Sequence, residues 1–243
     1  MPFNLDKLER LETQRRDFLV RALGAGFFAS GLAGAMLQAA YGAGKVPREL
    51  PPGKSIYEIK GRASVDGTQA SLDTQVQPNS LLETGRSSRI IFAVGKDAFI
   101  LRSNSRLQLS GNELVNTLRL AAGAVLSVFG KSEHRIVTTT ASVGIRGTGI
   151  YVESDPERSY VCTCYGVTDI QAATDANSRE QITSLHHDAP RYVTAGGAVG
   201  QRIQPAPFIN HTDTELMLIE ELVGRVPPFA FSGSGYTAPR RDY

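Results

Sequence analysis

The stretch Thr138-Thr-Thr-Ala-Ser-Val-Gly-Ile-Arg-Gly-Thr-Gly-Ile-Tyr-Val-Glu153 decides the fold class of this chain. Its residues are β-branched or aromatic where a pleated surface needs them, and glycine where backbones turn or come close. We therefore predict two short β-strands here, joined at Gly147-Thr148-Gly149. Nothing in the stretch has the pattern of a catalytic motif.

The sequence on either side continues the same pattern. Short apolar runs such as Arg89–Val94, Arg106–Leu109 and Ala124–Phe129 recur about every 8 to 12 residues. Turn residues separate the runs, and Asp66-Gly67 is a strong hairpin pair. The separator Ala121-Ala-Gly123 ends one run before the next begins. We predict an all-β fold, an antiparallel sandwich, a jelly roll or a short solenoid.

The C-terminal part of the chain predicts one helix. Thr212 and Glu215 form a capping box, and Gly224 has the place of a C-terminal cap. Four apolar residues at helical spacing lie between them: Leu216, Ile219, Leu222 and Val223. We expect this stripe to dock onto the β-domain within an otherwise irregular segment, 196–224, and we expect a loosely ordered tail over 225–243.

The first 43 residues have the pattern of an export signal. Paired arginines precede Phe-Leu and then a weakly apolar, Gly- and Ala-rich run over residues 22–40. This arrangement resembles a twin-arginine signal, carried by Arg15, Arg16, Phe18 and Leu19. We predict export to the periplasm by the twin-arginine translocation machinery. If the signal is not cleaved, residues 22–40 are expected to act as an inner-membrane anchor, with the protein facing the periplasm.

Composition excludes one class of partner. The formal charge is +2 and the apolar fraction is 41%, enough for a real core. Nucleic-acid affinity depends on neutralising many phosphates, and the body of the chain has no long Lys/Arg run to do so. We expect no nucleic-acid partner.

The two cysteines, Cys162 and Cys164, are separated by one residue. On a strand they face the same side, with Cα atoms about 6.5 Å apart, so a disulfide between them would be strained. Same-side thiolates suit copper(I) or zinc. The histidines that could complete the site are His186 or His187, together with His211. The alternative is that the cysteines are small buried apolar residues and that the histidines lie in loops.

Arg191 and Tyr192 form a second candidate site. An arginine beside an aromatic ring can bind a carboxylate or an anionic glycan. The alternative is structural: Asp188-Ala-Pro190 makes a turn, and Arg191 pairs with Asp188.

The order of several motifs resembles the FecR domain, the envelope-side module of the ferric-citrate signalling regulator and its relatives. The motifs are Ser80–Gly85, Ile90–Asp97, Leu118–Val125, Val137–Val143 and Gly147-Thr148. The resemblance covers roughly Ile56 to Ala172 and implies a FecR-like β-domain, which we place at 55–195 behind a linker at 44–54. It implies sensing or scaffolding. Only 21 residues precede the apolar run, so we expect no anti-sigma module in this sequence.

Enzyme motifs are lacking. The sequence has no Gly-x-Ser-x-Gly elbow and no His-Glu-x-x-His. We predict an exported, non-enzymatic domain that binds a small ligand or an envelope protein in signal sensing or regulation. The competing prediction is a periplasmic copper, zinc or redox protein that uses Cys162 and Cys164.

Overall fold

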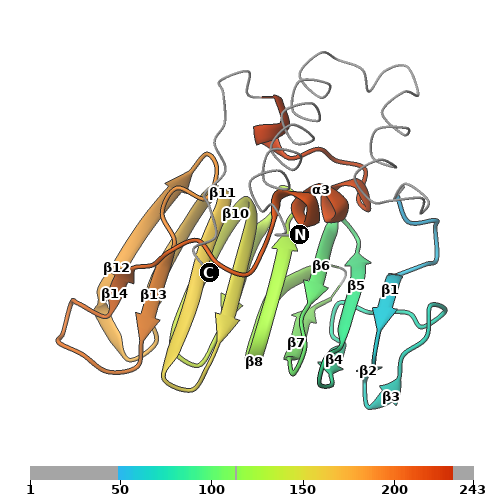
Figure 1. Cartoon of the computed structure of the whole chain (residues 1–243), viewed down its shortest axis with the longest axis horizontal. Coiled ribbons are helices and arrows are strands. Elements are labelled where there is room, and N and C mark those ends of the chain that lie inside the picture. The colour runs from blue at the N-terminus through green and yellow to red at the C-terminus, as the bar shows by residue number, and fades with distance from the viewer. Residues whose placement is uncertain (1–48, 113, 232–243) are drawn as a thin grey trace, which may run out of the picture. The chain divides into compact units, whose positions relative to one another are not determined.

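The computed structural model describes residues 49–112 and 114–231 (Figure 1). Strands make up 53% of these residues and helices 7%, so the all-β fold is confirmed. None of the helices within the described ranges has both the length and the apolar character needed to cross a membrane. The predicted export signal and most of the predicted tail lie outside the described residues.

Fourteen strands form one hydrogen-bonded sheet. In chain order they are β1 (Ile56–Lys60), β2 (Ala63–Val65), β3 (Thr68–Gln69), β4 (Leu81–Thr84), β5 (Arg89–Val94), β6 (Asp97–Leu101), β7 (Arg106–Gly111), β8 (Val115–Val128), β9 (Glu133–Val137), β10 (Ala141–Ser154), β11 (Arg158–Ala172), β12 (Asp175–Ser184), β13 (Arg191–Thr194) and β14 (Ile203–Pro205). All pairings are antiparallel except that of β8 with β9, which is parallel.

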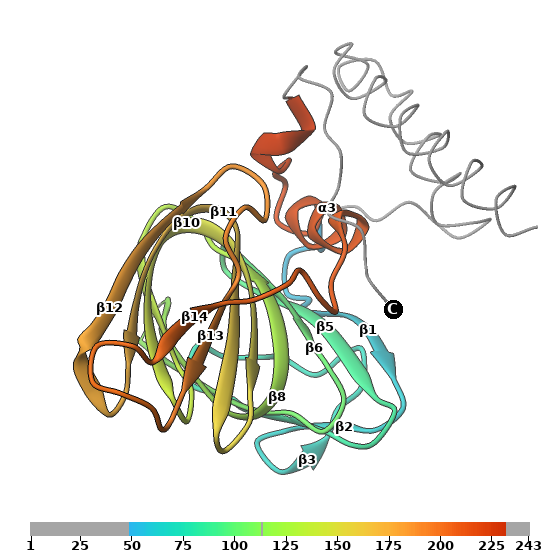
Figure 2. The same ribbon diagram turned by 60° about the vertical axis from the view of Figure 1, so that its left-hand side comes forward.

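The sheet curves back on itself into two layers, as Figure 2 shows. We call them the front and back layers. The front layer consists of β1, β5, β6, β13, β14 and the halves of the long strands that pair with them, and the back layer of the remaining strands. The long strands β8, β10 and β11 pass through both layers. Side chains from the two layers meet in one apolar core, which includes Phe92 and Val152 from the front and Leu118 and Ile170 from the back.

Bends at glycines allow the long strands to serve both layers, and here the predicted strand boundaries were wrong. β10 is one strand of 14 residues rather than two short ones. Its register shifts between Arg146 and Gly149, where Gly147 has φ of 56° and the partner changes from β9 to β8. A bulge with a left-handed glycine bends a strand without ending it. Gly123, with φ of 83°, lies at the corresponding bend of β8.

Helix α3 (Asp213–Glu221) confirms the capping-box prediction. Thr212 is the N-cap, and its side chain accepts from the backbone N–H of Glu215 while that glutamate bonds back to Thr212. Leu216, Ile219 and Leu222 are buried as predicted, whereas Val223 is half-buried. The helix packs against β6 and β8 and covers part of the outer face of the front layer. A short 3-10 turn, η2 (Pro228–Phe231), is the last described element.

Candidate metal centre

Cys162 and Cys164 lie on the outer face of β11, on the same side of the strand as predicted. Cys162 is directly opposite Tyr151 of β10, and Thr163 points the other way, toward the core side. Both cysteines have zero exposed surface and form no disulfide. A solvent-facing side of a sheet would leave them accessible, so their burial shows that other segments cover this face.

The first covering segment is the loop between β12 and β13, which supplies His187. Asp188 organises the loop, because its carboxylate accepts from the backbone N–H groups of Leu185 and His186. The N–H of His187 donates to the carbonyl of Cys164 at 2.9 Å, which fixes the loop on β11. His187 has φ of 55°, a left-handed conformation that is uncommon for residues with a side chain.

The second covering segment lies between β14 and α3 and supplies His211. Its backbone is attached to the sheet through the Tyr160 hydroxyl, which donates to the carbonyl of Pro207 at 3.0 Å. The His211 ring stacks on Tyr151, with centroids 4.5 Å apart. His211 has no exposed surface. The segment therefore brings a histidine from far along the chain directly over the two cysteines.

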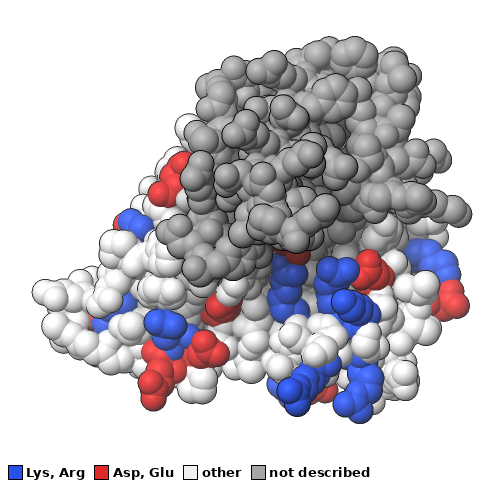
Figure 3. Space-filling view, viewed as in Figure 1, with Lys and Arg blue, Asp and Glu red and all other residues white. Residues whose placement is uncertain are grey.

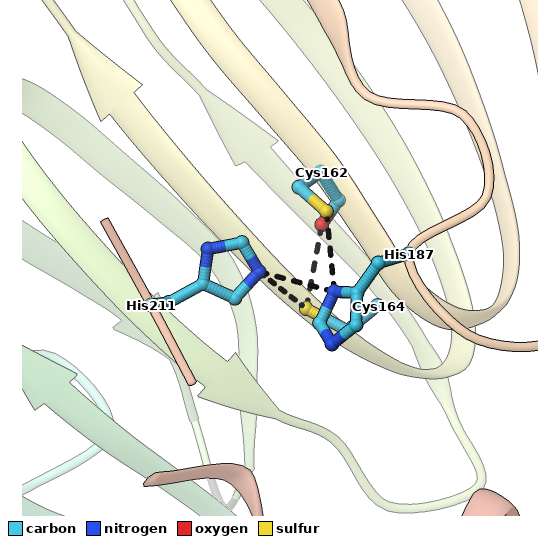
Figure 4. A group of neighbouring side chains, drawn as sticks. All are labelled: Cys162, Cys164, His187 and His211. Carbon is cyan, nitrogen blue, oxygen red and sulfur yellow. Dashed lines mark hydrogen bonds between the residues drawn. The ribbon is translucent and has the colours of Figure 1, made fainter. Parts of the chain in front are cut away.

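The four side chains converge, as Figure 4 shows. The Cys162 Sγ lies 3.4 Å from His187 Nδ1, the Cys164 Sγ lies 3.4 Å from His211 Nε2, and the two ring nitrogens are 3.1 Å apart. All four potential ligand atoms lie within 4.8 Å of one another. A tetrahedral ion with bonds of about 2.3 Å to sulfur and about 2.0 Å to nitrogen separates unlike ligands by about 3.5 Å and two nitrogens by about 3.3 Å. The three short separations are close to these values, and the remaining pairs of ligand atoms lie within 4.8 Å of one another.

The remaining ring nitrogens are also engaged. His187 Nε2 lies 3.1 Å from the Asp213 carboxylate, and His211 Nδ1 lies 2.7 Å from the carbonyl of Ile209. An N–H donated to a carboxylate or carbonyl leaves the opposite nitrogen of each ring as the lone-pair donor, and this is the support that metal-binding histidines have. His186 bonds to the same Asp213 oxygen at 2.8 Å. Of the two neighbouring histidines offered by the sequence, the structure therefore brings His187 into the cluster and places His186 behind Asp213.

The electrostatic environment favours the thiolate form of Cys162 although its side chain is buried. Burial alone would raise the pKa of Cys162, but its hydrogen-bonding interactions with Cys164, His187 and His211 outweigh burial and lower it. Burial and the neighbouring Cys162 raise the pKa of Cys164. Burial acts to lower the pKa of His187, yet its bonds to Asp213 and Cys162 raise it to about 9. A thiolate is the form that binds metal and also the form that acts as a nucleophile.

Three kinds of chemistry fit this residue set to different degrees. Cys162, His187 and Asp213 have the connectivity of a nucleophile, a base and an orienting carboxylate. However, Cys162 has no exposed surface, so a substrate carbonyl has no path to its sulfur. Inert buried cysteines would not require two histidine nitrogens aimed at them. A tetrahedral metal uses all four residues and both supporting acceptors.

The other predicted site residues lie apart from this cluster. Arg191 forms an ion pair with Glu180 at 2.6 Å rather than with Asp188. The Tyr192 ring has the Arg158 guanidinium above it at 4.3 Å. Their role in anion binding stays a prediction. Sequence reasoning missed Asp213, whose signal was its place at the start of the predicted helix, two residues after His211.

Comparison with known proteins gives little beyond this geometry. No family model matches the chain, and no curated protein matches it. Two crystal structures of a putative anti-sigma factor from Parabacteroides distasonis, at 1.65 Å and 2.50 Å resolution, are similar with a TM-score of 0.41 and 9% identity. Each match covers 52% of this chain and 57% of that chain, so the similarity spans little more than half the length of either protein.

Proposed function

We propose that this protein is a metal-binding β-domain in which Cys162, Cys164, His187 and His211 hold a single zinc ion. The observation that carries the proposal is the convergence of two sulfurs and two imidazole nitrogens within 4.8 Å, with three of their separations close to those around a tetrahedral ion. Two thiolates with two imidazoles in a tetrahedral arrangement are typical of zinc. Copper(I) is the competing ion, since it shares the preference for thiolates.

The ion would have a structural role. Its four ligands come from three separate segments, namely β11, the loop before β13 and the segment before α3. A catalytic zinc keeps one position open for water or substrate, whereas four protein ligands close the coordination shell. An ion held by all four side chains would attach the covering segments to the outer face of the front layer, without an enzymatic role.

The wider role that we propose is that of an exported binding module at the cell envelope, in signal sensing or regulation. The twin-arginine pattern and the motif order of the β-domain support this proposal. In such a module the metal ion would hold the segments of His187 and His211 against the front layer. The ligand or partner would bind elsewhere on the surface.

Elemental analysis of the purified full chain tests the metal assignment. We expect about one zinc per chain in the wild type and almost none in a Cys162→Ser/Cys164→Ser variant. His187→Gln should also lose the ion, whereas the neighbouring His186→Gln should retain most of it, because only His187 contributes a nitrogen to the cluster. Full zinc content in the double cysteine variant would contradict the proposal. Stoichiometric copper instead of zinc in the wild-type protein would assign the site to copper(I).

Thiol labelling separates the metal site from a nucleophilic cysteine. With zinc bound, we expect iodoacetamide to modify neither cysteine in the folded protein, and chelation to expose both. A nucleophile would behave differently: Cys162 alone would react rapidly in the folded protein, whether or not metal is present. Mass spectrometry of the alkylated peptides distinguishes the two patterns.

A further inference from the structure

The outer face of the back layer carries a polar hollow that the metal centre does not use. It lies across β8, β9, β10 and β11 and reaches Arg179 of β12, with a volume of about 360 Å³. Three arginines line it: Arg135, Arg146 and Arg179. The hollow is also lined by four uncharged polar residues: Asn116, Thr117, Ser142 and Gln171. Apart from the buried His134 and Ile145, the lining has no aromatic or large apolar side chain.

The arginines of this hollow differ from most of those elsewhere on the domain. Several others form ion pairs, as Arg89 does with Glu58, Arg102 with Glu215 and Arg225 with Glu220. Figure 3 shows basic and acidic side chains in mixed groups on the face seen in Figure 1. By contrast, Arg135, Arg146 and Arg179 are exposed and have no ion pair or hydrogen bond from their guanidinium groups to any part of the chain that the structure describes. Their donors are available to a ligand.

Gly144 forms the floor of the hollow. It lies in register between Arg135 of β9 and Asp169 of β11, so a missing side chain opens the space between them. The fold does not require glycine here. Its φ is not positive, and a Cβ would meet the nearest atom, Asp169 Cβ, at an ordinary 3.7 Å. A glycine inside a strand weakens it and often marks a bulge, a bend, or the close approach of a ligand or another backbone, and Gly144 lies at neither a bulge nor a left-handed bend.

We propose that this hollow binds a small saccharide that carries a phosphate or a carboxylate group. Guanidinium groups bind both anions through paired hydrogen bonds. Asp169, Glu133 and Gln171 offer acceptors for sugar hydroxyls beside the arginines. The two carboxylates would repel a long polyanion, and the volume is at the lower end of the range for small-molecule sites. The absence of aromatic side chains from the exposed lining argues against a stacked base.

Titration of the isotope-labelled, zinc-loaded full chain by NMR tests the proposal. The probes are glucose 6-phosphate, glucuronate, inorganic phosphate and glucose. We expect the phosphorylated or the carboxylated sugar to shift the NMR signals of Arg135, Arg146 and Gly144. The sugar that binds more tightly identifies which anion the hollow prefers. Arg146→Gln should lower the affinity for that sugar about tenfold. Gly144→Leu, which fills the hollow, should abolish binding. Arg86→Gln, an exposed arginine outside the hollow, is the matched control and should change nothing.

Three results would overturn the proposal. They are no binding of either sugar anion, glucose binding as tightly as both, and inorganic phosphate binding as tightly as glucose 6-phosphate. Because Gly144→Leu could disturb the strand, Arg135→Gln/Arg146→Gln provides a second test that leaves the backbone untouched. The zinc content of each variant is measured in parallel. If the protein retains zinc but binds no sugar, the proposal for this hollow fails while the assignment of the zinc site still stands.

Discussion

The two halves of β11 have different environments although they belong to one strand. From Ser159 to Tyr165 every side chain is buried, on both faces. From Gly166 to Ala172 only alternate residues are buried, and Asp169 and Gln171 lie toward the hollow. The first half carries the cysteines, which other segments cover completely. The second half carries part of an open polar face.

The difference shows that burial on this strand is determined by what covers its outer face. The core side is apolar in both halves, with Val161 in the first and Ile170 in the second. Only the first half lies beneath the loop of His187 and the segment of His211. If a metal ion attaches those segments, the first half depends on the metal and the second half does not.

The largest expected effect is that of zinc on stability. Zinc at about a thousandfold excess over its Kd should raise the free energy of unfolding by about 4 kcal/mol. For a domain of this size, that corresponds to a rise in Tm of roughly 12 °C. Calorimetry of chelated and zinc-loaded protein measures the shift, which should vanish in Cys162→Ser/Cys164→Ser. Hydrogen exchange should slow over 185–190 and 206–222 but not over β12. Equal slowing across the whole domain would contradict the division.

The second effect concerns the helix that covers the front layer. Leu216 has no exposed surface, so Leu216→Ala should lower the free energy of unfolding by about 3 kcal/mol through the lost burial and the cavity left behind. Leu72→Ala, at a side chain 54% exposed, is the control and should cost less than about 0.5 kcal/mol. Chemical denaturation measures both. A loss of sugar binding in Leu216→Ala would show that the two faces are coupled.

The sequence was sufficient to predict several parts of this arrangement. The two-residue period of a strand placed Cys162 and Cys164 on one side, and the capping box located α3. These features depend on neighbouring residues only, so short patterns carry them. The all-β fold followed from strand-like runs and turn residues in the same way.

Other parts depend on distant contacts and could not be predicted. The choice of His187 over His186 rests on a left-handed backbone at φ of 55°, stabilised by a bond to the carbonyl of Cys164. The continuity of β10 through Gly147 rests on a change of partner strand. Arg135, Arg146 and Arg179 line one hollow only because of the register of several strands. No local pattern encodes any of these.

The third prediction concerns Asp213, which would orient His187 without binding the ion. Asp213→Asn should lower zinc affinity by about 10- to 100-fold, because the amide is a weaker acceptor for the His187 N–H. Competition with a chromophoric chelator measures the affinity. Glu157→Gln, at an exposed acid outside the centre, should leave it unchanged. An unchanged affinity in Asp213→Asn would show that the carboxylate does not support the metal site.

The fourth prediction is that the stability contributed by Glu215 of helix α3 depends on pH. Burial would raise the pKa of Glu215, but its bonds to Arg102 and Thr212 outweigh burial and lower it. A carboxyl with a lowered folded-state pKa contributes stability above its unfolded pKa, and that contribution is lost as pH falls through the folded pKa. Glu215→Gln should therefore cost about 1–2 kcal/mol at pH 7 and less at pH 3. An equal cost at both pH values, measured by urea denaturation, would exclude the charge as the cause.

The smallest effect is expected at Gly144, and its meaning lies in the contrast with Gly149 on the same strand. A Cβ at Gly149 would lie 2.4 Å from the Tyr165 ring, which is held by a hydrogen bond to Glu220, so Gly149→Ala must displace buried side chains. A Cβ at Gly144 meets no such contact. Gly144→Ala should change the free energy of unfolding by less than about 0.5 kcal/mol, or stabilise slightly, because alanine loses less backbone entropy on folding. A large loss of stability in Gly144→Ala would mean that this glycine serves the strand, and the argument that it opens a binding hollow would then fail.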